Sequence, residues 1–516
     1  MLLRNTQHYK KAYIDNKFAD TWNFYVGDFM YKFQGTEVFE RLLDSYDNFF
    51  IYGDPDIDGL YATKLSIEFL KQRNKRYTYY INSNRLHGFM LMPETIKQLG
   101  RCCVLAVDFG MTVDEIQACV DNGISIVCID HHEVPQTYKA PIHIVNADAG
   151  AEGVLITNTY AFTTKDEQCL SGAGVCYTVF CDLDATFNTY ARRAYVGITL
   201  LSDSCPLEND LAASFLHDTF AWDSEESHDL INAVIPPRAY LHGRQKAFDR
   251  EFIDYTFSPV LNAMCRFNAC YEALALITNP KQNTDCTVYK ERQKPVIETL
   301  CNAMDITDYG ALLVCIINVP TDNIDGAHFG NFIGVIANRL LGEYKKTIYV
   351  ALYHNGVFCR ASVRGHGPHI EYLQLFQSCG IDCAGHRAAF GVSVAPTDAS
   401  IFPYITQLIV KAQADTVNCS SDATIVKVGN LLQYAQYGYQ AAIHNMYVRR
   451  DFRIYFDCAA CGYTIIKTNA TQTYTEYLIN GVVVKCFTRG ITPVNGIVQP
   501  MYTNGYVAYT LIANEL

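Results

Sequence analysis

The sequence predicts an α/β protein whose first domain contains a doubly wound parallel sheet. Apolar runs at Asn48–Tyr52, Cys103–Val107 and Ile124–Ile129 are typical of strands that are buried on both faces. Helix-like segments separate these runs, and strands joined in this way run parallel, with their carboxyl ends at one edge of the sheet. Ligands bind at that edge in doubly wound folds. Polar side chains that follow these strands are therefore expected to meet in one site.

Acidic and imidazole side chains follow each of the three strands. The candidates are Asp54, Asp56 and Asp58 after the first strand, Asp108 after the second, and Asp130, His131 and His132 after the third. Carboxylates that are buried close together repel one another unless a cation offsets their charge. The pattern therefore predicts a divalent metal site at this edge of the sheet.

These segments resemble the DHH phosphoesterase superfamily. The resemblance rests on the Asp-His-His triplet at 130–132 and on the Asp-x-Asp-x-Asp-Gly loop at 54–59. A fourth segment, Gly197–Leu207, contains Asp203 and stands where that family places its last metal aspartate. We expect a strand before each of the four segments. Either motif alone would be weak evidence, but four in the family order outweigh the alternative of scattered surface acids and core histidines.

Length and composition indicate a globular protein of several domains. The chain has 516 residues, which is too long for a single core, and it is 49% hydrophobic with 18% charged residues. No uninterrupted apolar run reaches the roughly 18 residues of a membrane span. The first residues, Met1–Lys10, also lack the apolar stretch of a signal peptide. We therefore expect a soluble, cytoplasmic protein that does not interact with membranes.

Cysteine usage and charge each allow two interpretations. The 20 cysteines are spread through predicted strands and helices, which favours buried reduced thiols over disulfides. Cys458 and Cys461 form one Cys-x-x-Cys pair, whereas a zinc knuckle needs four ligands. The net charge of −12 argues against a nucleic-acid partner, but six of the acids belong to the predicted metal site, where cations would offset them.

Changes in pattern along the chain predict five regions. They are an N-terminal cap (1–44), the metal-binding catalytic domain (45–215), a helical connector (216–305), a second α/β domain (306–400) whose first strand begins at Ala311–Ile317, and a β-rich C-terminal domain (423–516). The last prediction rests on Asn-Gly pairs at 480–481, 495–496 and 504–505, because Asn-Gly between apolar stretches is a strong hairpin signal. The predicted fold is therefore two α/β domains joined by a helical connector, plus a mainly β domain.

Several further segments resemble RecJ-type single-strand exonucleases within this superfamily. They are Leu170–Val175, with its Gly-Ala-Gly-Val, Ser258–Arg266, Asn84–Phe89, Gly334–Leu340, Ser362–Arg364 and Ala384–Gly391. The resemblance covers about residues 45–395. It implies that the second α/β domain is a DHH-associated substrate-binding domain. RecJ proteins often add an OB-like β domain, so the C-terminal region is expected to take that form.

The chain departs from the family pattern at three positions. Tyr52 stands where superfamily members often have a histidine four residues before the middle aspartate, so that one ligand is either missing or supplied by Asp54. Ala384 replaces the first glycine of the usual Gly-Gly-His, and Gly365 replaces the serine that commonly follows Ser-x-Arg. These departures affect the expected metal coordination and the fit of the substrate, but they do not change the resemblance to the superfamily.

The resemblance implies a role for each residue of the metal site. Asp56, Asp58, Asp108, His131 and Asp203 would bind two divalent ions, with Asp108 and Asp203 bridging them. His132 would contact the scissile phosphate, and Asp130 would orient the neighbouring imidazoles, although a purely structural loop cap is an equal alternative for Asp130. His132, Asp130 and Asp108 form the predicted catalytic set. Carboxylate and imidazole ligands suit Mn²⁺ or Mg²⁺, and the histidine favours Mn²⁺.

The resemblance also implies residues that recognise the end of a strand. Arg85, Arg266, Ser362 and Arg364 match the positions that hold the 5′-phosphate in RecJ-like enzymes, and arginine offers a planar fork for phosphate. His386 lies on a glycine-rich turn, where backbone amides can approach an anion. A surface ion pair is the alternative for each arginine, and a core or capping role is the alternative for His386.

The resemblance implies a Mn²⁺-dependent 5′→3′ exonuclease that degrades single-stranded DNA to 5′-mononucleotides in recombination or repair. RNA is an alternative substrate, and a single-strand-binding protein or a helicase would be a fitting partner. One alternative function is a phosphodiesterase of the same superfamily that cleaves oligoribonucleotides or cyclic dinucleotides. Another is a weakly active accessory protein that binds nucleic acid, an alternative that Tyr52 leaves open.

Overall fold

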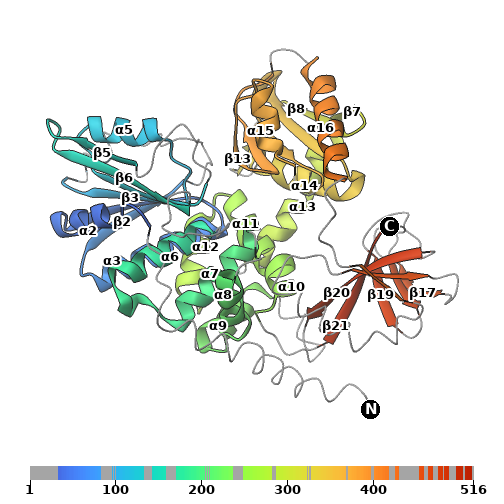
Figure 1. Ribbon diagram of the computed structural model, residues 1–516, viewed down its shortest axis with the longest axis horizontal. Helices are drawn as coiled ribbons and strands as arrows, with labels where there is room; N and C mark the ends of the chain where they lie inside the picture. The colour runs from blue at the N-terminus through green and yellow to red at the C-terminus, as the bar shows by residue number, and fades with distance from the viewer. Residues whose placement is uncertain are drawn as a thin grey trace.

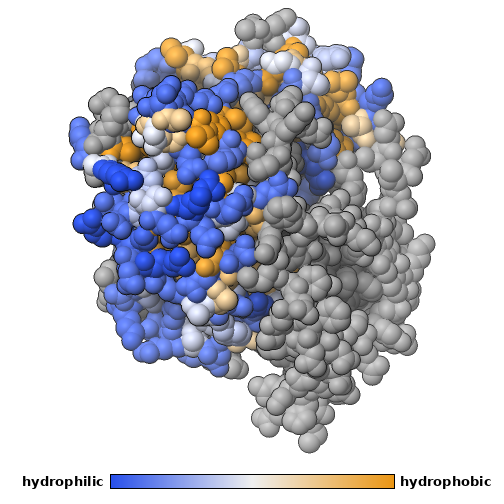
Figure 2. All heavy atoms as spheres, turned by 60° about the vertical axis from the view of Figure 1, so that its left-hand side comes forward, coloured by the Kyte–Doolittle hydropathy of each residue, from blue (hydrophilic) through white to orange (hydrophobic). Residues whose placement is uncertain are grey.

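The computed structural model describes residues 33–417 and the strands of the C-terminal region. Within 33–417 the description omits 83–95, 97, 99, 133–141, 159–169, 204, 206, 208–209, 236–247, 282–285, 322, 325–326, 368–369 and 397–399. Figure 1 shows three separate sheets, of which the first two are packed against helices and the third is not. This arrangement confirms the predicted fold class. Figure 2 shows that the visible face of the described residues is largely hydrophilic, with small apolar areas. No helix among these residues is long and apolar enough to cross a membrane.

The first sheet has six strands, and the three predicted strands lie at its centre. Its strands are β1 (Asn48–Gly53), β2 (Arg76–Ile81), β3 (Cys103–Val107), β4 (Ile126–Asp130), β5 (Ile142–Asn146) and β6 (Ala151–Thr157). They lie in the order β2-β1-β3-β4-β6-β5, and all neighbours are parallel except β5 and β6. The predicted runs correspond to β1, β3 and β4, so these predictions are confirmed.

Helices cover both faces of this sheet (Figure 1). The helices are α2 (Thr36–Ser45), α3 (Ile57–Gln72) and α6 (Gly172–Leu183) on one face and α5 (Val113–Asp121) on the other. Successive residues of a strand point to opposite faces, so Leu105 packs in the core with α3 and α6 while Val104 and Ala106 pack in the core with α5. Burial on both faces explains why these strands are continuous apolar runs instead of alternating ones.

The fourth predicted strand, before Asp203, is wrong. Residues 190–202 form the helix α7 (Tyr190–Ser202), and Asp203 is its C-cap. A Cβ on Gly197 would collide with Phe215 and Thr219 of α8 (Asp210–Phe220), so this glycine allows the two helices to approach closely. Helix α7 is buried along Ala194–Leu201, and such a largely apolar run does not distinguish a buried helix from a buried strand.

The segment predicted as a helical connector is helical in its described residues up to Asn302. It contains α8, α9 (Glu225–Val234), α10 (Arg250–Phe252), a π-helical turn at Ile253–Phe257, α11 (Ser258–Arg266), α12 (Cys270–Thr278) and α13 (Thr287–Asn302). Most of these helices share one core with α3 and α6. The buried ammonium group of Lys64 in α3 ties them together, because it donates to Glu226 Oε1 at 2.7 Å and to the Ile277 carbonyl at 2.8 Å.

The second sheet is mixed and follows the connector. It is built from β7 (Met304–Asp308), β8 (Leu312–Val319), β11 (Thr347–His354), β12 (Val357–Arg364), β13 (Cys383–His386) and β14 (Ala389–Val392), in the order β13-β14-β12-β11-β8-β7. Only β8 and β11 are parallel among these pairs, and α14 (Ile333–Tyr344) connects them after a small hairpin of β9 (Asn323–Ile324) and β10 (Ala327–His328) and a 3-10 turn at Phe329–Asn331. Helices α13 and α14 cover one face, and α15 (Tyr372–Ser378) and α16 (Ile401–Val417) cover the other.

The C-terminal region forms a seven-stranded sheet, in agreement with the predicted β character. Its strands are β15 (Ile425–Val428), β16 (Arg453–Asp457), β17 (Tyr463–Thr468), β18 (Thr475–Ile479), β19 (Val482–Cys486), β20 (Asn495–Thr503) and β21 (Tyr506–Ala513). Antiparallel pairs flank 480–481 and 504–505, as expected for hairpins. The hairpin at 495–496 is wrong, because Asn495 and Gly496 begin β20 and pair with Asp457 and Phe456. Pairing with a distant strand overrode this local turn signal. The OB-like form stays a prediction.

Candidate metal centre

The carboxyl ends of β1, β3 and β4 lie level with one another. Gly53 pairs with Val107, and Val107 pairs with Ile129, so the chain leaves the three strands at the same edge of the sheet. Helix α3 starts directly after β1, and Asp56 caps it by accepting a hydrogen bond from the Gly59 N–H at 3.1 Å. The register therefore brings together acidic and imidazole side chains from three separate segments.

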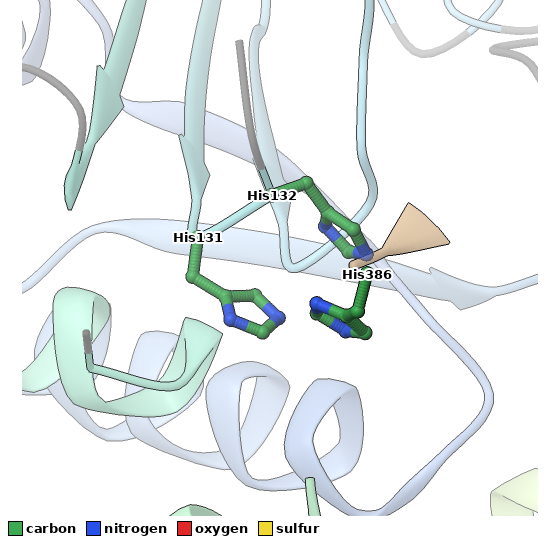
Figure 3. A group of neighbouring side chains, drawn as sticks. All are labelled: His131, His132 and His386. Carbon is green, nitrogen blue, oxygen red and sulfur yellow. The ribbon is translucent and has the colours of Figure 1, made fainter. Parts of the chain in front are cut away.

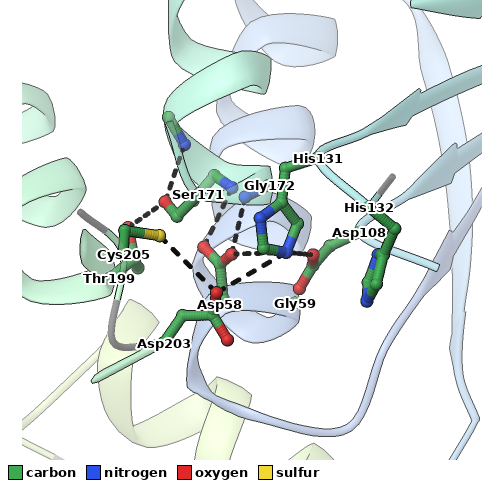
Figure 4. Close-up of polar contacts among 12 residues, drawn as sticks. Asp58, Gly59, Asp108, His131, His132, Ser171, Gly172, Thr199, Asp203 and Cys205 are labelled. Atoms are coloured by element: carbon green, nitrogen blue, oxygen red, sulfur yellow. Dashed lines mark hydrogen bonds and ion pairs between the residues drawn. The ribbon is translucent and has the colours of Figure 1, made fainter. Parts of the chain in front are cut away.

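Three carboxylate oxygens surround one imidazole nitrogen (Figure 4). The Nε2 atom of His131 lies 3.2 Å from Asp108 Oδ1, 3.7 Å from Asp203 Oδ2 and 3.8 Å from Asp58 Oδ2. Asp58, Asp108 and His131 are buried. Donors around one ion, at bond lengths near 2.0–2.2 Å, lie about 3–3.5 Å apart when they are neighbours. The distances from His131 Nε2 to each of the three carboxylates are therefore close to those between neighbouring ligands of a cation.

The amino end of α6 holds Asp58 in place. The backbone N–H groups of Gly172 and Ala173 donate to its two carboxylate oxygens at 2.6 and 2.9 Å, in the first turn of the helix, where the helix dipole also favours a negative charge. Ser171 caps the same helix, and its hydroxyl is 2.8 Å from that of Thr199 in α7. A Cβ on Gly172 would lie 2.6 Å from the Asp108 Cβ, so only glycine fits at this position.

Asp108 has a left-handed backbone conformation, with φ of 57°. This conformation is uncommon outside glycine and costs of the order of 1 kcal/mol or more. The Asp108 N–H donates to the Ile129 carbonyl at 2.9 Å, which keeps the strained residue against β4. The strain turns the carboxylate towards His131 and is of the kind that structures retain at functional sites.

Asp130 connects the two histidines of the triplet. Its Oδ1 accepts a hydrogen bond from the His131 backbone N–H at 2.8 Å and lies 2.8 Å from His132 Nδ1. Burial alone would lower the pKa of His132, but the Asp130 carboxylate outweighs it and raises that pKa. Burial would likewise raise the pKa of Asp130, yet the two histidines lower it. One carboxylate oxygen of Asp130 thus contacts both the His132 ring and the backbone of the loop, and its charge favours the protonated form of His132.

His386 reaches the same cluster from β13 of the second α/β domain (Figure 3). Its Nε2 lies 3.7 Å from Asp203 Oδ1, its ring stacks on His132 with centroids 5.1 Å apart, and the His131 ring centroid is 5.2 Å away. Partial burial and the two neighbouring imidazoles lower the pKa of His386 to about 3. The cluster thus draws side chains from both α/β domains.

The carboxylates of the cluster are electrostatically strained without a counter-charge. Burial raises the pKa of Asp108, and the neighbouring Asp58 raises it further. Burial also raises the pKa of Asp58, with Asp56 adding to the effect, and raises that of Asp203 to about 7. A divalent cation would remove this repulsion, and carboxylate and imidazole donors suit Mn²⁺ and Mg²⁺. The donor set therefore fits the predicted metal ions.

Comparison with known proteins finds one family model that matches part of the chain. Residues 48–198 match the DHH family, N-terminal domain, and this stretch contains the strands and histidines described above. The chain therefore contains a DHH-family domain, and outside this domain it is similar to RecJ-type proteins. We refer to residues 48–198 as the DHH domain.

The relatives are distant at the level of sequence. The putative SPbeta prophage-derived single-strand DNA-specific exonuclease YorK of Bacillus subtilis (strain 168) is 20% identical over 347 residues, which are 60% of this chain and 55% of that protein. The single-stranded-DNA-specific exonuclease RecJ of Bacillus subtilis (strain 168) is 24% identical over 391 residues, which are 71% of this chain and 46% of RecJ. The chain thus spans about half the length of the curated relatives that it matches.

Solved structures share the fold. RecJ of Thermus thermophilus in complex with Mn²⁺ superposes with a TM-score of 0.61 at 17% identity, over 92% of this chain and 70% of RecJ. Its complex with Mg²⁺ gives a TM-score of 0.58 at 15% identity, over 94% of this chain and 70% of RecJ. At this level of identity the likeness establishes the architecture of the chain.

Tyr52, which stands where superfamily members often have a histidine, is a buried core side chain of the DHH domain. Its ring stacks on Tyr80 with centroids 5.6 Å apart and meets Phe109 edge-on at 4.5 Å. Burial raises the pKa of its phenol, and the neighbouring Tyr80 and Asp54 add to the effect. The position therefore carries a neutral phenol within an aromatic group, and Asp54 lies close enough for its charge to raise the pKa of that phenol.

The residues predicted to bind the end of a nucleic-acid strand come from both the helical connector and the second α/β domain. Arg364 in β12 donates from Nε to Asn338 Oδ1 at 2.8 Å and from Nη1 to the Ser362 hydroxyl at 2.9 Å, so the structure brings Ser362 and Arg364 together. Arg266 ends α11, and its Nη1 donates to Gln293 Oε1 at 2.9 Å. Arg85 lies outside the described residues.

Three contributions to the site were not predicted. The Gly172 and Ala173 amides hold Asp58, Asn338 holds the Arg364 guanidinium, and Cys205 lies beside Asp203. The Gly-Ala-Gly-Val resemblance points to the right segment for the first, but a backbone contact leaves no side-chain signal. Asn338 and Cys205 are ordinary residue types that become informative only when their neighbours are known.

Proposed function

We propose that the chain is a metal-dependent phosphodiesterase, specifically a RecJ-like 5′→3′ exonuclease that degrades single-stranded DNA to 5′-mononucleotides. The observation that carries the proposal is the ring of three carboxylates around His131 Nε2, completed by His386 from the second domain. The names of the relatives, single-strand DNA-specific exonucleases, support the choice of substrate.

The metal ligands in this proposal are Asp56, Asp58, Asp108, His131 and Asp203, with Asp54 near the site. Two bound Mn²⁺ or Mg²⁺ ions would supply a hydroxide at neutral pH and clamp the attacking and leaving oxygens at phosphorus. The Asp203 carboxylate turns Oδ2 towards His131 and Oδ1 towards His386, as a bridging ligand would. Asp108 is buried, lies 3.2 Å from His131 Nε2 and has Asp58 as a close charged neighbour, which supports its role as the second bridge.

The catalytic role of His132 follows from its proton. The Asp130 carboxylate lies 2.8 Å from Nδ1 and raises the pKa of the ring, which favours the protonated form, and in this form Nε2 would donate to a phosphate oxygen. A cation in this place would bind the scissile phosphate and offset charge that builds up on it in the transition state. Asp130 acts through His132 and is a positioning residue.

Recognition of the 5′ end is assigned to the cationic residues around the domain junction. Arg364 is held by two side-chain acceptors, which orient its guanidinium for a bidentate contact with a terminal phosphate. Ser362, Arg266 and Arg85 would add contacts, and His386 would face the scissile phosphate next to His132. Binding of the terminal phosphate beside the metal centre accounts for the 5′→3′ polarity.

In the cell, the proposed activity belongs to DNA recombination or repair in the cytoplasm. A single-strand-binding protein or a helicase would present the single strand. RNA is the alternative substrate, because the residues assigned to the phosphates do not read the sugar.

The deciding experiment is a product ladder with 5′- and 3′-labelled single strands of DNA and RNA. Oligonucleotides of about 30 nucleotides exceed one strand-binding site. Labelled mononucleotide released at once from 5′-labelled DNA with Mn²⁺, and abolished by a chelator, is the expected result. Cleavage of very short fragments alone would instead identify a small-substrate phosphodiesterase, and retention of DNA without cleavage would identify an accessory protein.

A further inference from the structure

A thiol lies among the carboxylates of the metal centre. Cys205 Sγ is 3.5 Å from Asp203 Oδ2, and the same oxygen is 3.7 Å from His131 Nε2. Figure 4 shows the sulfur pointing at the Asp203 carboxylate. The donor atoms of His131, Asp203 and Cys205 lie within 4.8 Å of one another, and Cys205 is buried. The metal centre therefore contains a soft donor that the proposed Mn²⁺ chemistry does not use.

The end of α7 holds this thiol in position. The Asp203 N–H donates to the Thr199 carbonyl at 2.9 Å, and the Cys205 N–H donates to the Leu200 carbonyl at 3.0 Å. Both residues are thus anchored by backbone hydrogen bonds to the last turn of one helix. The spacing of the sulfur and the carboxylate follows from these two anchors.

The spacing fits a tetrahedral zinc site. Zinc–sulfur and zinc–oxygen bonds are about 2.3 and 2.0 Å long. In a tetrahedron, a sulfur and an oxygen donor are then roughly 3.5 Å apart, and a nitrogen and an oxygen donor are roughly 3.3 Å apart. The observed separations are 3.5 Å and 3.7 Å. Asp58 Oδ2 lies 3.8 Å from the same His131 Nε2 but outside this group of three donors. Thiolate ligands favour Zn²⁺ over Mn²⁺ and Mg²⁺.

We propose that His131, Asp203 and Cys205 bind Zn²⁺ through a Cys205 thiolate at one of the two metal positions. The inference rests on the proposed metal-dependent function and adds a thiol ligand to its site. Binding replaces the S–H proton with the metal ion and releases that proton to solvent. Zn²⁺ and Mn²⁺ then compete for one position, so that the metal content of the centre depends on the zinc supply.

Cobalt absorption provides a test that does not depend on activity. Chelator-stripped full-length protein is titrated with Co²⁺, and a sulfur-to-cobalt charge-transfer band in the near ultraviolet is expected, together with visible cobalt absorption. One equivalent of Zn²⁺ should remove the charge-transfer band and lower the visible absorption, because cobalt keeps the second metal position. In Cys205→Ser the charge-transfer band should vanish while visible absorption remains, and the Zn²⁺ affinity should fall at least tenfold, the lower end of the loss for a ligand-supporting residue.

Two control variants isolate Cys205 from the other thiols. Cys176→Ser removes a buried thiol in α6 whose pKa is raised by burial and by the nearby Asp108 and Asp58, and the band should persist. The double variant Cys458→Ser/Cys461→Ser removes the Cys-x-x-Cys pair and should also retain it. Circular dichroism checks the fold of each variant. If Cys205→Ser does not fold, Asp203→Asn should weaken the band by removing the neighbouring donor.

The outcomes separate this inference from the proposed function. A charge-transfer band that survives in Cys205→Ser, or that disappears in the Cys458→Ser/Cys461→Ser protein, would overturn the thiolate site. Visible cobalt absorption without any charge-transfer band would overturn it too, while leaving the carboxylate–imidazole metal centre in place. A protein that binds no cobalt at all would contradict both the thiolate site and the metal-dependent phosphodiesterase.

Discussion

The two halves of the site are built in different ways. In the DHH domain, Asp58, Asp108 and His131 are buried, and backbone amides and strand ends hold them. In the second α/β domain, Arg364 is half-buried and the His386 side chain is 42% exposed, and Arg364 is held by the side chains of Asn338 and Ser362. The comparison indicates a rigid acidic half suited to metal ions and a more accessible cationic half suited to a phosphate chain.

The largest expected effect comes from the acidic half. Asp108→Asn should lower kcat about a thousandfold or more, since a bridging metal ligand supplies several kcal/mol of transition-state stabilisation. Asparagine tolerates the left-handed backbone at this position, so the fold should persist. The metal-free protein should even melt at a higher temperature, because one of the mutually repelling buried carboxylates is gone. Hydrolysis rates and thermal melts measure both effects.

The exposed acid Asp114 on α5 provides the matched control. Asp114→Asn should leave the rate unchanged and should not raise the melting temperature, since the side chain is exposed and its charge favours the first turn of α5. Near-normal activity of Asp108→Asn would contradict the bridging role and would remove the functional distinction between the two halves.

The next effect tests whether backbone geometry makes the acidic half rigid. Gly172→Ala should weaken Mn²⁺ binding and activity by about 10- to 100-fold, the usual cost of disturbing a residue that supports metal ligands. The added Cβ would press on Asp108 and displace the amides that hold Asp58. Calorimetric Mn²⁺ titration measures the loss.

Gly174→Ala, one half-turn further along α6, is the control for the glycine effect. Its Cβ would lie 3.1 Å from the Leu170 Cβ and 3.3 Å from Val196 Cγ1, a tight contact that touches no acidic side chain. Equal losses of Mn²⁺ affinity in the two variants would mean that α6 packing, and not the Asp58 clamp, controls the site.

A smaller and more selective effect is expected in the cationic half. Arg364→Ala should reduce cleavage of 5′-phosphorylated strands about tenfold relative to 5′-hydroxyl strands, in line with the loss of a hydrogen bond to a charged group. The competition between the two substrates in one reaction measures the ratio. Arg387→Ala, in the same domain, should leave the ratio unchanged, because Arg387 is exposed and pairs with Glu371 at 3.5 Å.

Asn338 makes the same test sharper. Asn338→Ala removes the acceptor of the Arg364 Nε–H and should shift the ratio in the same direction by a few fold, about the worth of one net hydrogen bond. In the Arg364→Ala background it should have no further effect, since the two residues would act as one unit. Equal losses of cleavage rate on 5′-phosphorylated and 5′-hydroxyl strands would mean that Arg364 does not recognise the 5′ end.

The smallest expected effect is a pH dependence of the acidic half. Burial raises the pKa of Asp203 to about 7, above its value in the unfolded chain. Its contribution to stability is therefore fully present below pH of about 4 and is lost as the pH rises towards 7. Because Mn²⁺ favours the ionised form, the rise in melting temperature caused by Mn²⁺ should grow over this window. A rise that is constant with pH would contradict the link between Asp203 and metal.

Local patterns predicted much of the DHH domain. The apolar runs at β1, β3 and β4 are long enough to identify buried strands, and the acids and histidines follow them directly in the chain. The same reasoning failed at α7, where a largely apolar run is compatible with either a strand or a helix. It failed again at Asn495-Gly496, where pairing with β16 replaced the turn.

The sequence by itself determined the residue types of the site and the edge of the sheet where they gather, because strand ends and their next residues are linked by a few covalent bonds. Only the tertiary structure decided which distant groups join them. His386 comes from a different domain than His131, and the Gly172 amides and the Cys205 sulfur arrive on the ends of α6 and α7. Such contacts depend on how helices and domains pack, a long-range property that no local pattern records.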